Sequence, residues 1–93
     1  MKITFDPAKH LWTLRERIID FRDAEQVFDG PTFTFQDDRR DYPEPEGRFV
    51  TAGLLAGRMV IIVWTPMGDD WRHVISMRKA NDREQARYRD RLG

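Results

Sequence analysis

The spacing of apolar residues in this chain predicts two helices near its beginning. The first is predicted to begin at Pro7, where the missing N–H costs nothing, with Asp6 as its cap. Its apolar side would carry Leu11, Trp12 and Leu14. A second helix fits residues 21–28, and Gly30-Pro31 would end it. The first third of the chain therefore favours helix after a short opening strand.

After residue 30 the pattern changes to the alternation that is typical of strands. Residues 59–64 are nearly continuous in apolar side chains, which predicts a central strand buried on both faces. Ala56-Gly57 would form a tight turn before it. Asn81 and Glu84 make a capping box for a final helix of about ten residues. The predicted strands cover residues 1–5, 32–36, 48–54, 58–65 and 71–77.

The resulting element order is β-α-α-β-β-β-β-α, which predicts one α+β domain over residues 1–93. We expect a small antiparallel sheet of about four strands, with two N-terminal helices and a C-terminal helix. The helices would cover one face and leave the other partly open. Residues 37–47, with two prolines and many charges, are predicted to form a loop.

Composition narrows the class of protein. The chain has no cysteine, which excludes disulfides, thiolate zinc sites and cysteine nucleophiles. No apolar run approaches the roughly 18–20 residues that a membrane span needs, and the opening residues are typical of structure rather than of a signal peptide. We therefore expect a cytoplasmic protein that makes no membrane contact.

The net charge is zero, but its distribution is uneven. Residues 1–46 hold 7 Lys/Arg against 11 Asp/Glu, a balance of −4, and residues 47–93 hold 9 against 5, a balance of +4. This asymmetry could mark a surface for a polyanion in the C-terminal half. A solvated charged helix would explain much of the same excess with no partner, and composition alone favours that explanation.

The last predicted strand carries the most chemical content. Strict alternation places Arg72, Ser76 and Arg78 on one face and His73 on the other. Guanidinium groups beside a hydroxyl suit a phosphodiester, because arginine makes paired, charge-assisted hydrogen bonds with phosphate oxygens. Surface ion pairs, such as Arg78 with Glu84, would explain the same residues, and the pattern alone favours them.

RNA cleavage without a metal ion needs a base, an acid and cations for the charge on the phosphate. Histidine exchanges protons near neutral pH, so His73 is a candidate although alternation turns it away from the arginines; His10 is a weaker one. A metal site is not expected, because the acids are scattered and the histidines lack ligand spacing. In extended segments the neighbours in Asp37-Asp38 and Asp69-Asp70 would point in opposite directions.

Four segments, each weak alone, match the pattern of one known family in their order and spacing. They are Phe5-Asp6-Pro7-Ala8-Lys9, the run from Asp20-Phe21 to Val27-Phe28-Asp29, Arg48-Phe49-Val50-Thr51-Ala52-Gly53, and Arg72-His73-Val74-Ile75-Ser76-Met77-Arg78-Lys79-Ala80 with Arg83-Glu84 and Tyr88. Through these segments the chain resembles the BrnT family of ribonuclease toxins.

The resemblance implies a compact RelE-like fold and an RNA endonuclease without cofactors that inhibits translation and growth in bacterial stress. It also implies a BrnA-type antitoxin with a ribbon-helix-helix domain, through which alone the toxin would reach operator DNA. The assembly would be a homodimer or a heterotetramer with the antitoxin. The implied site residues are Arg72, Ser76, Arg78 and His73 for catalysis and Lys9, Arg58, Lys79, Arg83 and Glu84 for RNA binding.

The chain departs from the family pattern after the first helix and before the last strand. Glu16-Arg17-Ile18 stands where the family has Lys-His-Gly, which removes a histidine and a glycine suited to a left-handed helix end. Met67 stands where the hairpin often carries an arginine, with Trp71 nearby. A lost cation would weaken catalysis. The alternatives are therefore an attenuated toxin that only binds protein or nucleic acid, and an unrelated interaction domain.

Overall fold

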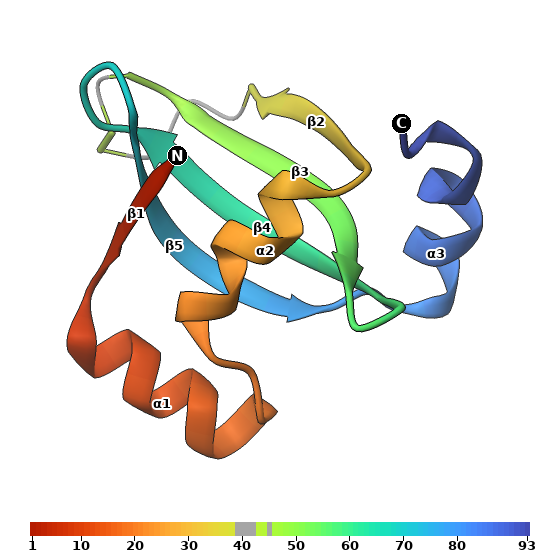
Figure 1. Cartoon of the computed structure of the whole chain (residues 1–93), viewed down its shortest axis with the longest axis horizontal. Coiled ribbons are helices and arrows are strands. Elements are labelled where there is room, and N and C mark those ends of the chain that lie inside the picture. The colour runs from red at the N-terminus through yellow and green to blue at the C-terminus, as the bar shows by residue number, and fades with distance from the viewer. Residues whose placement is uncertain (39–42, 45) are drawn as a thin grey trace.

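The computed structural model describes residues 1–38, 43–44 and 46–93, and within them one five-stranded sheet carries helices on both faces (Figure 1). The α+β fold class is confirmed. The strands are β1 (Lys2–Phe5), β2 (Thr32–Asp37), β3 (Arg48–Leu55), β4 (Arg58–Pro66) and β5 (Trp71–Lys79). The helices are α1 (Pro7–Arg17), η1 (Phe21–Asp23), α2 (Ala24–Asp29), α3 (Asp82–Tyr88) and η2 (Arg89–Arg91).

The strand order is β1-β5-β4-β3-β2, so β4 lies at the centre, as its apolar sequence predicts. The neighbours from β2 to β5 are antiparallel, whereas β1 joins β5 as a parallel edge strand. β1 pairs only with residues 71–74 of β5. Among the described residues, the second half of β5 therefore has no strand beside it on that edge, and α1 contacts β5 there instead (Figure 1).

Two apolar clusters hold the helices to the sheet. The larger one joins α2 and η1 to one face through Phe21, Val27 and the β4 residue Ile62. Close packing of this layer needs a glycine in β3, because a Cβ on Gly53 would lie 2.5 Å from Val27 Cγ1. The smaller cluster joins α3 to the opposite face. The expectation that the helices share one face is therefore wrong.

Aromatic contacts explain the position of α3. The Tyr88 ring packs at 5.7 Å from that of Phe33 and 5.8 Å from that of Phe35, both on β2. The capping box predicted for this helix is present, since Glu84 N donates to Asn81 Oδ1 and Asn81 N donates to Glu84 Oε1. Hydrophobic burial and the cap together turn the C-terminal segment back across one end of the sheet.

A bulge in β5 decides where its side chains point. Ile62 pairs with Met77 and Trp64 pairs with Val74. A step of two residues along β4 is therefore matched by a step of three residues along β5. Ile75 is the extra residue. A bulge of this kind reverses the alternation beyond it, because one residue is left outside the ladder. Val74 and Met77 thus both face the α2 side, and both are buried.

The ends of α1 follow its sequence. Asp6 caps the helix by accepting a hydrogen bond from Ala8 N at 2.9 Å. The helix ends at Ile18 in the left-handed conformation (φ 57°, ψ 41°), which glycine adopts more easily than a β-branched residue. The loop predicted over residues 37–47 lies partly outside the described residues. None of the helices that the structure describes is long and apolar enough to span a membrane.

Candidate functional site

The bulge at Ile75 separates Arg72 from the residues that were expected to join it. The Arg72 guanidinium lies over the rings of Trp64 and Phe28, at 4.2 and 4.5 Å from their centroids, on the α2 side of the sheet. Burial there lowers the pKa of Arg72. The prediction that Arg72 shares a face with Ser76 and Arg78 is therefore wrong, because strict alternation does not allow for a bulge.

The same bulge brings His73 to the face that carries Ser76 and Arg78. Directly paired residues of antiparallel strands share a face, and alternate residues of β4 do so as well. The prediction that His73 points away from Ser76 and Arg78 is also wrong. His73 and Ser76 oppose β4 residues two positions apart, which corresponds to about 7 Å along the strand. The pairs on this face are Thr65 with His73, Val63 with Ser76 and Ile61 with Arg78.

The His73 ring is held by β1. Its Nδ1 lies 2.7 Å from Thr4 Oγ1, which also contacts Met67 Sδ at 3.7 Å. When the Thr4 hydroxyl donates to Met67, it accepts from Nδ1–H of the imidazole, and Nε2 is left to accept a proton. The pKa of Glu44 is lowered chiefly by a hydrogen bond from Arg48 and to a smaller extent by His73. An acid therefore lies within electrostatic reach of this ring.

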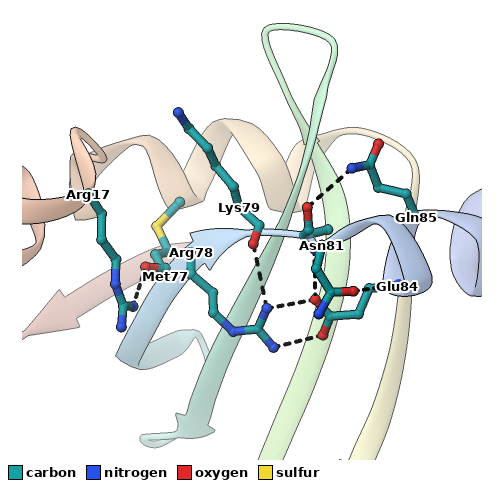
Figure 2. Close-up of polar contacts among 8 residues, drawn as sticks. Arg17, Met77, Arg78, Lys79, Asn81, Glu84 and Gln85 are labelled. Carbon is teal, nitrogen blue, oxygen red and sulfur yellow. Dashed lines mark hydrogen bonds and ion pairs between the residues drawn. The ribbon is translucent and has the colours of Figure 1, made fainter.

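Arg78 is oriented by an ion pair with the start of α3. Its Nη1 and Nη2 donate to Glu84 Oε1 and Oε2, both at 2.7 Å (Figure 2). The pair raises the pKa of Arg78 and lowers that of Glu84. The expected Arg78–Glu84 ion pair is thus present, and the Arg78 side chain is still 41% exposed. Within the described part of the chain, its Nε–H group makes no hydrogen bond.

A hollow of about 430 Å³ lies between α1 and the unpaired edge of β5. We call it the α1–β5 hollow; it is lined by Ala8, Lys9, Trp12, Thr13, Arg17, Ile75 and Ser76. Arg17 Nη1 donates to the Met77 carbonyl at 3.0 Å, and the Arg17 guanidinium lies 5.0 Å from the Trp12 ring centroid. The hollow therefore places two cations beside Ser76.

Figure 2 shows on which side of β5 these groups lie. The guanidinium groups of Arg17 and Arg78 extend to one side of the strand, whereas the side chains of Met77 and Lys79 extend to the other. Because Ser76 and Arg78 share a face of β5, these two cations lie on the side of the strand that carries Ser76. We call the group formed by Lys9, Arg17, His73, Ser76 and Arg78 the β5 site.

Arg17 was not among the site residues expected from sequence. The resemblance does point to this position, because it implies a histidine where the chain has Arg17. The structure shows that the change leaves a cation in the α1–β5 hollow rather than a gap. Arg17 is therefore a candidate site residue.

The remaining residues expected to bind RNA do not gather at the β5 site. Arg58 and Lys79 line a different hollow with Ile18 and Ile19, on the α2 side. Arg83 lies exposed on α3. Of the five expected binding residues, Lys9 lines the α1–β5 hollow and Glu84 contacts Arg78.

Met67 contacts the β5 site through the Thr4 hydroxyl, which also holds His73, whereas His10 lies apart from it. Met67, half exposed, lines a hollow with Glu44 and Glu46 at the β4–β5 turn, so an arginine there would meet carboxylates first. His10 Nε2 lies 2.9 Å from Asp20 Oδ1, and its ring packs against those of Phe5 and Phe21. His10 thus ties α1 to η1.

The chain is similar to a family model and to a solved structure. The family model, described as "Ribonuclease toxin, BrnT, of type II toxin-antitoxin system", matches residues 5–84. The crystal structure of the Brucella abortus ribonuclease toxin BrnT is similar with a TM-score of 0.62 and 25% identity, covering 88% of this chain and 99% of that one. No curated protein sequence matches the chain significantly.

Proposed function

The chain belongs to the BrnT family of ribonuclease toxins of type II toxin–antitoxin systems, and we propose that it cleaves RNA at the β5 site without a metal ion. One observation supports this location of the active site. The bulge at Ile75 places His73, Ser76 and Arg78 on one face of β5, and α1 adds Lys9 and Arg17 beside Ser76. A proton carrier and a cation therefore share a face of β5 with Ser76, and two further cations line the same hollow as Ser76.

The proposed reaction is attack of a ribose 2′-oxygen on the adjacent phosphorus. The new O2′–P bond forms as the P–O5′ bond breaks, which leaves a 2′,3′-cyclic phosphate and a 5′-hydroxyl. The 2′-hydroxyl proton goes to His73 Nε2, the nitrogen that faces away from Thr4. The departing O5′ takes a proton from solvent water, and His73 afterwards returns its proton to the solvent, so protons balance and no oxidant or reductant is needed.

The cations have separate roles in this proposal. Arg78, fixed by Glu84, presents its Nε–H side to a phosphate oxygen and stabilises the charge that grows on the phosphorane. Lys9 and Arg17 hold the neighbouring phosphates by charge. Ser76, which lines the same hollow as Lys9 and Arg17, orients the scissile group with its hydroxyl. Arg72 is left out of the reaction, because it packs on the other face.

The distribution of acids supports cleavage without a metal ion. Among the residues that the structure describes, no three His, Asp or Glu side chains gather as a metal site would require. The acid that contacts Arg78, Glu84, is occupied by that ion pair and by the cap of α3. Charge stabilisation from guanidinium groups is then the alternative that the side chains offer.

Family membership supports the rest of the proposal. A toxin of a type II system has a protein antitoxin, and we assign to this chain a BrnA-type ribbon-helix-helix partner in the bacterial cytoplasm. The toxin would contact operator DNA only through that partner. Cleavage of cellular RNA would then inhibit translation and growth whenever the antitoxin is lost.

The test is cleavage of a single-stranded RNA in EDTA, with analysis of the product ends. The wild-type chain should give 2′,3′-cyclic phosphate and 5′-hydroxyl ends. His73→Ala and Arg78→Ala should each lower kcat by about 100-fold or more, since one positioned proton carrier or charge donor contributes on that order. Arg89→Ala, an exposed arginine on η2, is the matched control and should cleave like wild type.

Arg72→Ala separates the two possible faces. It removes a cation from the α2 side, so the protein should lose stability and keep its cleavage rate once folded. Loss of cleavage in Arg72→Ala with full activity in Arg78→Ala would contradict the β5 site. Cleavage that stops in EDTA and returns with Mg²⁺ would contradict the metal-free mechanism.

An attenuated toxin is the second candidate, favoured by Arg17 in the position of the family histidine. This alternative predicts that the wild-type chain binds RNA and its antitoxin but leaves RNA intact. Replacing Arg17 by histidine would then restore cleavage. The same assay therefore decides between the two.

A further inference from the structure

Trp12 stands out among the residues of the α1–β5 hollow because it is a large aromatic side chain exposed to solvent. Trp12 lines the hollow, and 46% of its surface is exposed to solvent. Most aromatic side chains of this protein are used in the two apolar clusters, as Phe21 and Tyr88 are. Trp12 is held instead by a guanidinium, that of Arg17, 5.0 Å from its ring centroid.

We infer that Trp12 and Arg17 form a subsite that stacks one unpaired RNA base next to the phosphate bound at the β5 site. This inference rests on the proposed ribonuclease function and deepens it by naming a single-stranded substrate. An indole offers a flat face to any base, and base–aromatic stacking is the usual way in which single-stranded nucleic acid is held without sequence readout.

The charge of the hollow fits a nucleotide. Its lining contains Lys9 and Arg17 and, within the described part of the chain, no carboxylate. Phosphates on either side of a stacked base would meet these two cations. The apolar side chains of Ile75 and Ala8 complete a surface that suits the base rather than the sugar–phosphate backbone.

The volume and position of the hollow fit the same occupant. About 430 Å³ accommodates one nucleoside but not a base pair with both its backbones. Ser76 belongs both to the lining and to the face that carries His73 and Arg78. A base seated on Trp12 therefore has its own phosphate beside the proposed reactive groups, which would fix the register of the cut.

Binding measured without cleavage tests the inference. The probe is a labelled single-stranded RNA with 2′-O-methyl riboses throughout, which lacks the nucleophile and stays intact. Trp12→Ala should weaken its binding, measured by fluorescence anisotropy, by about tenfold, the loss expected for one base stack. Trp12→Phe, which keeps a smaller ring, should retain most of the affinity.

Trp71→Ala is the matched control. Trp71 is exposed to a similar extent, 42%, and is also covered by a cation, Lys2 at 5.3 Å, but it lies at the opposite end of β5. Its loss should leave RNA affinity unchanged. An abasic site moved along the RNA should weaken binding to wild type at one position and should have no effect there in Trp12→Ala.

Three results would overturn the subsite: Trp12→Ala binding as tightly as wild type, equal losses in Trp12→Ala and Trp71→Ala, or equal affinity of wild type for duplex and single-stranded RNA. A hollow that seats a protein segment instead would give the first of these. Failure of the proposed function is a different result, namely that wild type leaves a 2′-hydroxyl RNA uncut. Circular dichroism of each variant confirms its fold.

Discussion

Replacement of Ile18 by glycine is expected to stabilise the protein. Ile18 ends α1 in the left-handed region, with φ 57° and ψ 41°. Ala56, at φ 50°, is the other residue besides glycine with a positive φ in the described ranges. A β-branched residue is poorly suited to this region, because its Cβ substituents crowd the following carbonyl. Strain is therefore stored at the point where the chain leaves α1.

The magnitude follows from two opposing contributions. The left-handed conformation costs an L-residue about 1–2 kcal/mol, and a β-branched one lies at the upper end. Glycine removes this strain but raises the entropy of the unfolded chain by about 0.5–1 kcal/mol. Little apolar burial is lost, because the Ile18 side chain is 76% exposed. The net gain in the free energy of unfolding is about 1 kcal/mol, or roughly 4–8 °C in Tm for a domain of this size.

Urea and thermal unfolding of Ile18→Gly against wild type measure this gain. The urea midpoint should rise with an unchanged m-value, since the native surface is the same. Leu14→Gly is the control, because glycine within α1 should cost about 1 kcal/mol at an ordinary helical position. A fall in Tm for Ile18→Gly similar to that for Leu14→Gly would show that no strain is stored at the helix end.

Two further predictions concern charge. The pKa of Glu84 is lowered below its ordinary 4.5, chiefly by the hydrogen bond from Arg78, so the pair adds to the free energy of unfolding above that pH and loses this contribution as pH falls. Urea unfolding in acid should therefore show a shallower loss of stability in Glu84→Gln; an identical acid limb would contradict it. Met67→Arg should not raise RNA cleavage, because the new guanidinium would pair with Glu44 and Glu46 and the Thr4 hydroxyl that holds His73 would lose the sulfur that accepts its hydrogen bond. A clear rise in cleavage rate would instead support attenuation through Met67.

The sequence predicts the elements of this fold well wherever one physical signal dominates. The apolar run over residues 59–64 identifies the central strand, and the Asn81–Glu84 capping box identifies the start of α3. The departure from glycine at Ile18 points to the left-handed end of α1. Each of these depends on local chemistry, which a single sequence contains.

The arrangement of the site depends on contacts between distant segments, and there sequence reasoning fails. No residue type around Ile75 marks a bulge, since the run from Val74 to Met77 is compatible with a regular strand. One unrecognised bulge residue changes the predicted face of every residue before it in β5. As a result His73, and not Arg72, lies on the same face as Ser76. Likewise, the position of Tyr88 against β2 depends on a pairing of segments more than fifty residues apart.

The position of the bulge has a structural reason that links the fold to the site. β1 ends its pairing with β5 at Val74, and Ile75 is the next residue. Before this point the edge of β5 is bound by a strand; after it, the edge is covered by α1, with Arg17 donating to the Met77 carbonyl. A bulge bends and twists its strand locally, which suits a change from a strand neighbour to a helix neighbour. The feature that lets α1 approach β5, and so forms the hollow with Lys9 and Arg17, is thus the same one that turns His73 toward Ser76.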